Sequence, residues 1–307
     1  MMINNNSSLN QLLDCVLSIS PSHEKFLKNS FKSRTEREIS FSKEIATYIL
    51  KLKSDDLFNC IKNYLWTCEQ LTTEGLYFKR NYSYRFTKFK DVAEQVYTKP
   101  DYMNKYLDGL LLTQVLWKNQ FDAIFHLKNY YCSLFHKPFK HLEIGPGHGL
   151  LLYLIAENHF CQYAEAWDIS ESSLQHTAQC LHKLEGKADI KFCRINAEEL
   201  TNVESNSFDS VVISEVLEHV ENPDKILREL SKKMNNNAYI FINIPINSPA
   251  IDHIYHLKTV EQSIDLVESN GYKIINKSFY PMTGYTLESA IKRAATISCV
   301  IVAQKQE

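Results

Sequence analysis

The stretch His141-Leu-Glu-Ile-Gly-Pro-Gly-His-Gly149 decides how the rest of this sequence is interpreted. An apolar run passes into three glycines within five residues and then into the apolar segment Leu150-Leu-Leu-Tyr-Leu-Ile155. Only 8 of the 307 residues are glycine, whereas average usage of about 7% predicts roughly 21. Glycines at such a junction let the backbone turn sharply and let a ligand lie directly against it. The stretch therefore predicts a strand, a ligand-binding turn and a helix.

Short apolar runs alternate with segments of helical periodicity from residue 138 to 307. Helices are predicted over Leu150–Asn158, Ser172–Leu184, Pro223–Met234 and Thr259–Asn270. Strands are predicted over Phe139–Ile144, Tyr163–Ile169, Ile190–Ile195, Phe208–Ser214, Ala238–Ile244, Lys273–Phe279 and Ser298–Gln304. This alternation predicts an α/β, Rossmann-like fold. Its seven-stranded, mainly parallel sheet has helices on both faces and binds ligands at the carboxyl ends of the strands.

The first part of the chain has a different pattern. Leu57, Ile61, Tyr64, Leu65 and Cys68 recur at helical spacing, and glycine is almost absent before position 109. We expect an N-terminal helical domain over residues 1–100, which forms a lid over the substrate. A second domain, 101–307, consists of leading helices over 101–137 and the sheet core over 138–307.

Composition excludes several classes of protein. No apolar run approaches the roughly 18 residues that span a bilayer, and the N-terminus lacks the pattern of a signal peptide. The eight cysteines contain no C-x-x-C pair, so the sequence indicates neither a disulfide framework nor a thiolate zinc site. We therefore expect a cytoplasmic protein that does not interact with membranes.

Charge is distributed unevenly. Residues 1–137 hold 19 Lys and Arg against 14 Asp and Glu, while residues 138–307 hold 15 against 22. Residues 76–90 interleave six aromatic with five basic side chains. Such a stretch can bind nucleotides or another anionic ligand; alternatively, it is an amphipathic strand or loop that packs its rings on the helices.

The glycine-rich turn differs from a dinucleotide-binding fingerprint in two respects. Leu150 stands where the third glycine of that fingerprint belongs, and Glu143 precedes the turn, where an acid repels a pyrophosphate but attracts a cation. The resulting pattern, E-x-G-x-G-x-G, resembles the first motif of class I S-adenosylmethionine-dependent methyltransferases. The resemblance implies that S-adenosyl-L-methionine is the cofactor and that its methionine part contacts Glu143, Gly145, Pro146, Gly147 and Gly149.

The resemblance continues through the following strands. Asp168, followed by Ile169, matches the acid that binds both ribose hydroxyls in that family. Asn196 and Ala197 match the segment that flanks adenine, although the family usually has Asp at the Asn196 position. Ser214 and Glu215 match residues that border the methionine part.

The acceptor is less clearly indicated. The turn after the fourth strand lacks the Pro-Pro motif of enzymes that methylate nucleic-acid amino groups, and no proline precedes a cysteine as in cytosine C5 methyltransferases. In Glu215-Val-Leu-Glu218-His219, a helical turn would place two carboxylates and an imidazole on one face, and His253 follows the next strand. These four residues can hold a divalent metal ion that acidifies a hydroxyl acceptor.

The same four residues allow other interpretations. The E-x-x-E-H pattern resembles that of ubiquinone-pathway O-methyltransferases, and with His253 it also resembles the metal site of small-RNA 3′-terminal 2′-O-methyltransferases. Alternatively, His219 or His253 acts as a base without metal, or the group only positions the acceptor.

We therefore expect a methyltransferase that methylates an oxygen, or a carbon, of a small-molecule acceptor in a biosynthetic pathway. One alternative is a metal-dependent RNA 2′-O-methyltransferase, which the basic stretch from Lys79 to Lys90 and the possible group of metal ligands favour. A second alternative is a non-catalytic protein that binds the cofactor and uses the fold as an interaction surface.

Overall fold

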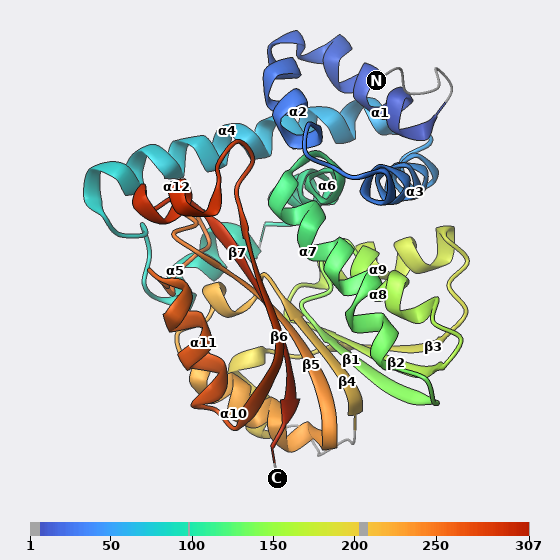
Figure 1. Ribbon diagram of the computed structural model, residues 1–307, viewed down its shortest axis with the longest axis vertical. Coiled ribbons are helices and arrows are strands. Elements are labelled where there is room, and N and C mark those ends of the chain that lie inside the picture. The colour runs from blue at the N-terminus through green and yellow to red at the C-terminus, as the bar shows by residue number, and fades with distance from the viewer. Residues whose placement is uncertain (1–6, 98, 203–207, 307) are drawn as a thin grey trace.

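The computed structural model describes residues 7–97, 99–202 and 208–306, and among these residues the chain forms one seven-stranded sheet with helices around it (Figure 1). The strand order is β3-β2-β1-β4-β5-β7-β6. Strands β1 to β5 are parallel, and β7 is antiparallel to both β5 and β6. The strands are β1 (Phe139–Ile144), β2 (Cys161–Asp168), β3 (Asp189–Arg194), β4 (Phe208–Ser214), β5 (Met234–Ile246), β6 (Tyr272–Pro281) and β7 (Ile297–Lys305). The predicted fold class is thereby confirmed.

The order of the strands reverses between β1 and β4, which are neighbours in the sheet. The chain leaves β1 toward β2 and β3 on one side, and leaves β4 toward β5 on the other. Parallel sheets bind ligands at the carboxyl ends of the strands at such a reversal. The turns after β1 and β4 are therefore where the fold offers a binding site.

Helices cover both faces of the sheet. Their bounds are α1 (Ser8–Ile19), α2 (Glu24–Phe31), α3 (Glu36–Leu52), α4 (Leu57–Asn81), α5 (Phe89–Val92), α6 (Pro100–Leu116), α7 (Lys118–Asn129), α8 (Leu150–Ala156), α9 (Glu171–Lys183), α10 (Pro223–Lys233), α11 (Val260–Glu268) and α12 (Leu287–Lys292). The single turns are η1 (Pro21–His23), η2 (Ala93–Tyr97, a π-helix), η3 (Tyr131–Leu134), η4 (Ala197–Asn202) and η5 (Leu217–His219).

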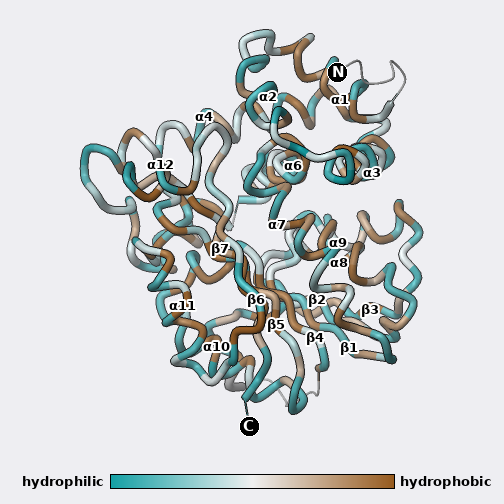
Figure 2. The backbone as a smooth tube through the Cα atoms, viewed as in Figure 1, coloured by the Kyte–Doolittle hydropathy of each residue, from teal (hydrophilic) through white to brown (hydrophobic). Residues whose placement is uncertain are grey.

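Alternation along the central strands divides the core between the two faces. On β4, Val212 packs with the cluster that includes α7, α8 and α9, whereas Val211 and Ile213 pack with α10 and α11. Successive side chains of a strand point to opposite faces, so a central strand buried on both faces is apolar throughout. The strands accordingly form the hydrophobic centre of the molecule in Figure 2.

The N-terminal helices gather at one end of the sheet (Figure 1). Leu12 and Val16 of α1 and Ile45 and Ile49 of α3 recur at helical spacing and are fully buried. They belong to the same hydrophobic cluster as Val212 of β4. Helix α6 begins at Pro100, at the predicted domain boundary, but the division into two domains stays a prediction.

The aromatic and basic stretch over residues 76–90 is not a single strand or loop. Its first six residues complete α4, which ends at Asn81, and its last two residues begin α5. The helical periodicity of α4 continues into the stretch, because Phe78 lies on the buried face of that helix. Two of its basic residues form ion pairs within the chain: Arg85 with Glu74, and Lys88 with Glu221.

None of the helices in the described part of the chain combines the length and the apolar character that crossing a membrane requires.

Candidate functional site

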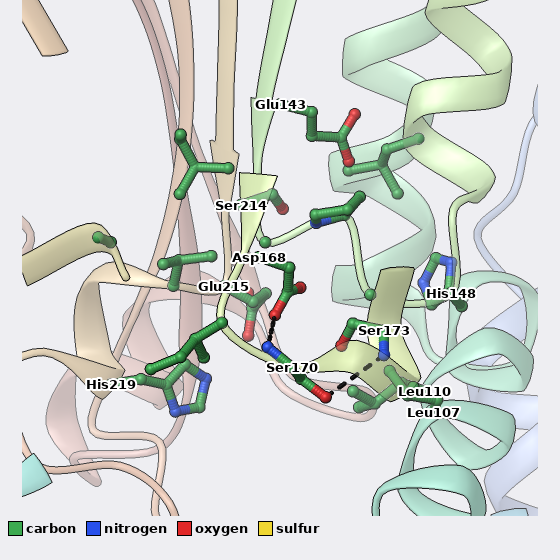
Figure 3. A pocket seen from close by; sticks show the side chains of 18 of the residues that line it. Leu107, Leu110, Glu143, His148, Asp168, Ser170, Ser173, Ser214, Glu215 and His219 are labelled. Carbon is green, nitrogen blue, oxygen red and sulfur yellow. Dashed lines mark hydrogen bonds between the residues drawn. The ribbon is translucent and has the colours of Figure 1, made fainter. Parts of the chain in front are cut away.

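A cavity lies where the carboxyl ends of the strands face the N-terminal helices (Figure 3). One wall comes from the turns that follow β1, β2, β3, β4 and β5, and the other from α5, η2, α6 and α7. The predicted cofactor residues that line it are Glu143, Gly145, Pro146, Gly147, Asp168, Ile169, Asn196, Ala197, Ser214 and Glu215. Among the predicted cofactor residues, Gly149 lies outside this lining, at the start of α8.

The glycine-rich turn is held by one hydrogen bond to β2 and by one within the turn itself. The Gly145 N–H donates a hydrogen bond to the Trp167 carbonyl at 2.8 Å, and the Gly149 N–H donates to the Pro146 carbonyl at 2.8 Å. Gly147 and Gly149 have φ of 56° and 80°, a backbone conformation that favours glycine. A Cβ on Gly149 would lie 2.7 Å from the Thr177 Cα of α9. Gly147 therefore faces the cavity, whereas Gly149 allows the turn to pack against α9.

Glu143 presents an unsatisfied carboxyl group. It is 2% exposed, and its Oε2 has no hydrogen-bond partner among the described residues. Burial raises the pKa of Glu143 to about 8. The neighbouring His141 Nε2 is 3.8 Å away, but burial lowers the pKa of His141 to about 3, so this imidazole is neutral. A cationic ligand group in the cavity would supply the missing partner.

Asp168 ends β2 and points into the cavity (Figure 3). Its Oδ1 accepts a hydrogen bond from the Ser170 backbone N–H at 2.8 Å, and Ser170 caps α9 through Ser173. Burial raises the pKa of Asp168 to about 6, against the opposing effect of the Ser170 bond. The carboxylate is thus fixed in orientation and keeps acceptor capacity for ligand hydroxyls.

Asn196 and Ala197 follow β3 and line the cavity at the start of η4. The Asn196 Oδ1 accepts a hydrogen bond from the Glu198 backbone N–H at 3.0 Å. One lone pair of this oxygen therefore holds the turn in place. The other is the one that a ligand amino group can use.

Ser214 ends β4 and Glu215 follows it, and both contact Asn243 of the neighbouring strand β5. The Asn243 Nδ2 donates to Ser214 Oγ at 3.2 Å and to Glu215 Oε1 at 2.9 Å. Glu215 has a φ of 53°, so the chain changes direction at this residue. Burial raises the pKa of Glu215 to about 7.

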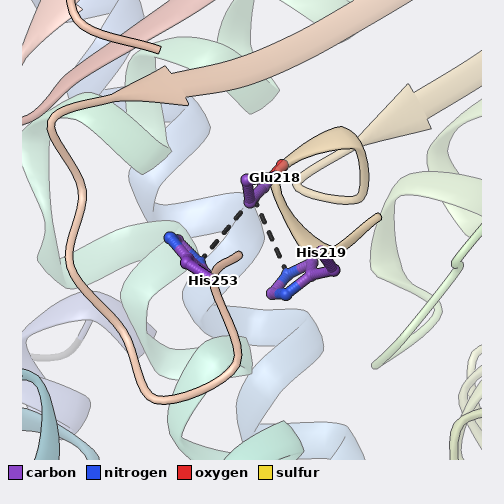
Figure 4. A group of neighbouring side chains, drawn as sticks. All are labelled: Glu218, His219 and His253. Carbon is purple, nitrogen blue, oxygen red and sulfur yellow. Dashed lines mark ion pairs between the residues drawn. The ribbon is translucent and has the colours of Figure 1, made fainter. Parts of the chain in front are cut away.

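Glu218, His219 and His253 form a group of three potential metal ligands, with ligand atoms all within 4.8 Å of one another (Figure 4). His219 Nε2 is 3.8 Å and His253 Nε2 is 3.9 Å from Glu218 Oε1. Glu218 is completely buried, and neither of its carboxyl oxygens has a hydrogen-bond partner among the described residues. Burial and the negative charge of Glu215 raise the pKa of Glu218 well above its usual value.

The other ring nitrogen of each histidine is fixed by the backbone. His219 Nδ1 donates to the Asp252 carbonyl at 3.0 Å, and His253 Nδ1 donates to the Ser248 carbonyl at 2.5 Å. A carbonyl oxygen only accepts, so Nδ1 carries the hydrogen in both rings. Burial, with His219 nearby, lowers the pKa of His253 to about 4, so that ring is neutral. Both Nε2 atoms lie on the side of the Glu218 carboxyl group, and that of neutral His253 can offer a lone pair.

Glu215 is the fourth predicted metal ligand, and it lies outside this group of three. A helical turn after the strand was expected to bring it to the same face. The turn η5 instead begins at Leu217 and is a single 3-10 turn, and the Glu215 carboxylate bonds to Asn243. Its role as a ligand stays a prediction.

Three cavity residues carry functional groups that the sequence did not reveal. Tyr97 on η2 and Tyr106 on α6 extend from the N-terminal helices, and Asp252 follows β5. Their hydroxyl and carboxyl groups meet in the structure. Only Asp252 had a local signal, because it precedes His253. The tyrosines are 9 residues apart on separate elements, so no motif connects them.

Comparison with known proteins gives matches that centre on the glycine-rich turn and the strands around it. A family model described as "Methyltransferase domain" matches residues 142–240. "Ubiquinone biosynthesis O-methyltransferase" of Neisseria meningitidis is 32% identical over 108 residues, which is 35% of this chain and 44% of that protein. The protein of the same name from Photobacterium profundum is 28% identical over 42% of this chain and 52% of its own length. The chain thus spans about half the length of these curated relatives.

Among solved structures, the N-methyltransferase NodS from Bradyrhizobium japonicum, in complex with S-adenosyl-L-homocysteine, aligns with a TM-score of 0.49. It is 13% identical, and the alignment covers 61% of this chain and 88% of NodS.

Proposed function

Because this chain belongs to the class I S-adenosylmethionine-dependent methyltransferase superfamily, we propose that it transfers a methyl group from S-adenosylmethionine to a hydroxyl group of a small molecule. The observation that supports a hydroxyl acceptor is the group of Glu218, His219 and His253 beside the cofactor cavity. The printed names of the curated relatives support O-methylation in a biosynthetic pathway.

In this proposal the chain binds the cofactor through its acids. Asp168 accepts hydrogen bonds from both ribose hydroxyls, since a carboxylate offers two acceptor oxygens for two neighbouring donors. The amino group of the methionine part pairs with Glu143, whose Oε2 otherwise lacks a partner. The turn at Gly147 lets the cofactor approach the backbone closely.

The residues after β4 and β5 fit a divalent metal ion. The Glu218 carboxylate and the Nε2 of neutral His253 are both acceptors when Glu218 is deprotonated, so their close approach is then repulsive unless a cation lies between them. Each histidine also donates its other N–H to a backbone carbonyl, an arrangement typical of metal-bound histidines. A bound divalent ion would lower the pKa of an acceptor hydroxyl group. This arrangement favours a metal site over a metal-free histidine base.

A small acceptor suits the cavity better than RNA. Tyr106 is buried and Tyr97 is half-buried, and both belong to η2 and α6, which form one wall of the cavity. Arg85 and Lys88, from the basic stretch that favoured RNA, have acidic partners within the chain. Sequence-independent binding of RNA depends on free basic groups that reach the phosphates.

The test uses a cell extract that has been separated into a small-metabolite fraction and an RNA fraction. The protein is incubated with each fraction and methyl-labelled S-adenosylmethionine, and the label transferred to each fraction is measured. We expect label in the small-metabolite fraction, and a loss of at least tenfold in rate with Glu218→Gln. His182→Gln, on the exposed end of α9, is the matched control and should leave the rate unchanged. Label confined to RNA would favour the RNA alternative, and cofactor binding without transfer to either fraction would favour the non-catalytic alternative.

Chelation tests the metal directly. We expect thorough chelation to abolish transfer, and one of Mg²⁺, Mn²⁺, Zn²⁺ or Fe²⁺ to restore it. Undiminished transfer after chelation would refute the metal site and leave the histidines as bases or positioning groups.

A further inference from the structure

A buried carboxylate remains at the acceptor side of the cavity after the cofactor and metal residues are assigned. Asp252 lies in the turn after β5, is 1% exposed and lines the cavity. It follows the strand next to β4, so it stands beside His219 without being one of the three potential ligands.

The partners of Asp252 hold its carboxylate only loosely. Tyr97 Oη is 3.5 Å from Oδ2, and Tyr106 Oη is 3.5 Å from Oδ1. Hydrogen bonds between oxygens normally measure about 2.5–3.0 Å. His219 Nδ1 is also 3.5 Å from Oδ2, but it donates to the Asp252 main-chain oxygen at 3.0 Å. Both carboxylate oxygens therefore keep capacity for a further donor.

The two tyrosines are donors. Burial, reinforced by the negative charge of Asp252, raises the pKa of Tyr97 and of Tyr106 well above the usual value, so both stay neutral. A buried carboxylate without short hydrogen bonds is costly. A ligand that brings an ammonium or hydroxyl group between these side chains would relieve that cost.

The charges around Asp252 have the same sign. Among the described cavity residues, the Asp, Glu, Lys and Arg side chains are all acidic: Glu143, Asp168, Glu215 and Asp252. Glu143, Asp168 and Glu215 border the predicted cofactor, which leaves Asp252 for the acceptor. In the metal-free protein, a carboxylate or phosphate placed beside Asp252 would meet like charge in a medium of low dielectric constant.

We propose that Asp252 selects the acceptor: it accepts a hydrogen bond from an ammonium or hydroxyl group of the substrate, assisted by Tyr97 and Tyr106. The cavity accordingly takes neutral or cationic acceptors and rejects those with a carboxylate or phosphate at this position. This inference rests on the proposed function, in that it takes the cavity as the acceptor site.

The side chains that line this part of the cavity suggest which compounds to use as binding probes. Phe89 stacks on Tyr97 with ring centroids 5.9 Å apart, and both line the cavity together with Met103, so this wall offers apolar and aromatic contacts to a ring. Tyramine and 4-hydroxyphenylacetate share a phenol and differ in carrying an ammonium or a carboxylate, and 4-hydroxyphenylethanol is the neutral member of the series.

The experiment measures binding of the three phenols to the full chain saturated with S-adenosylhomocysteine, by calorimetry. We expect tyramine to bind at least tenfold more tightly than 4-hydroxyphenylacetate, with the alcohol in between. Asp252→Asn should reduce the preference to less than threefold and leave the Kd of S-adenosylhomocysteine unchanged. Asp265→Asn removes one exposed carboxylate from α11 and is the charge-matched control, which should keep the full preference.

Tyr97→Phe provides a second variant that keeps the ring and removes only the hydroxyl group. We expect it to weaken tyramine binding two- to fivefold. Equal binding of the acid and the amine, a preference that survives Asp252→Asn, or no binding of any of the three phenols would overturn the proposal. The measurement needs neither metal nor methyl transfer, so its failure is distinct from failure of the proposed function, which would appear as loss of S-adenosylhomocysteine binding or of methyl transfer.

Discussion

Replacement of Gly149 by alanine is expected to destabilise the protein strongly, whereas the same replacement at Gly147 is not. Both residues have positive φ, 80° and 56°. A Cβ on Gly149 would lie 2.7 Å from Thr177 Cα and 3.0 Å from Cys180 Cβ, and a backbone atom cannot rotate away. A Cβ on Gly147 would have Leu107 Cδ2, at 3.6 Å, as its nearest neighbour, which is an ordinary contact.

The expected losses in the free energy of unfolding follow from the backbone conformation and from the packing. The left-handed backbone costs an L-residue about 1–2 kcal/mol, and this applies to both variants. Overpacking against α9 adds about 1–3 kcal/mol for Gly149→Ala alone. We therefore expect a loss of roughly 2–5 kcal/mol for Gly149→Ala, against about 1–2 kcal/mol for Gly147→Ala.

Urea unfolding followed by circular dichroism measures both losses, and calorimetry with S-adenosylhomocysteine measures binding. Gly147 lines the cavity, so Gly147→Ala should bind the cofactor product at least tenfold more weakly in spite of its milder effect on stability. Equal stability of the two variants would refute the packing argument. Unchanged binding by Gly147→Ala would refute the placement of the cofactor against the turn.

Further predictions concern titration and buried charge. The pKa of Asp168 is about 6, so S-adenosylhomocysteine binding should weaken as the pH falls below 6 and this acceptor is protonated. Asp168→Asn should bind S-adenosylhomocysteine 10- to 100-fold more weakly at pH 7.5. The pKa of Glu143 is about 8, so at pH 7 binding of the cationic amino group should release a proton, seen by calorimetry in buffers of different ionisation enthalpy; Glu143→Gln should abolish that release. Lys53→Met breaks a largely buried ion pair with Asp108 and should cost about 1–3 kcal/mol in urea unfolding, whereas Lys28→Met breaks an exposed pair and should cost under about 0.5 kcal/mol.

The sequence predicted the centre of the sheet well because β1, β4 and β7 are buried on both faces and are therefore largely apolar. The start of β5 is the instructive exception. The strand begins at Met234 and passes through three asparagines, which are typical of a turn, whereas the sequence predicted Ala238. Asn235 Nδ2 donates to Asp209 Oδ1 at 2.6 Å, and Asn237 has a φ of 63°. A tertiary contact and an irregular residue extend the strand, and neither has a local signal.

The same distinction applies to the site. Glu143, Asp168 and the glycines lie at strand ends, where sequence order alone determines that they share an edge of the sheet. Tyr106 reaches the cavity because α6 packs against α4 and α9, and Tyr97 because η2 packs against α6, so no spacing rule identifies them. Local backbone geometry determines that Glu215 lies apart from Glu218 and His219. The turn after Glu215 starts two residues later than a continuous helix would.

The shared hydrophobic cluster of α1, α3 and β4 limits how acceptor specificity can change. A module can be exchanged between proteins only if few contacts cross its boundary, and here buried residues of the N-terminal helices and of the sheet belong to one cluster. Grafting a foreign N-terminal segment onto this sheet would leave apolar surface unmatched on both pieces. A new acceptor is therefore more readily accommodated by point substitutions at cavity positions such as Phe89 and Met103, which face the ligand, than by recombination of whole segments.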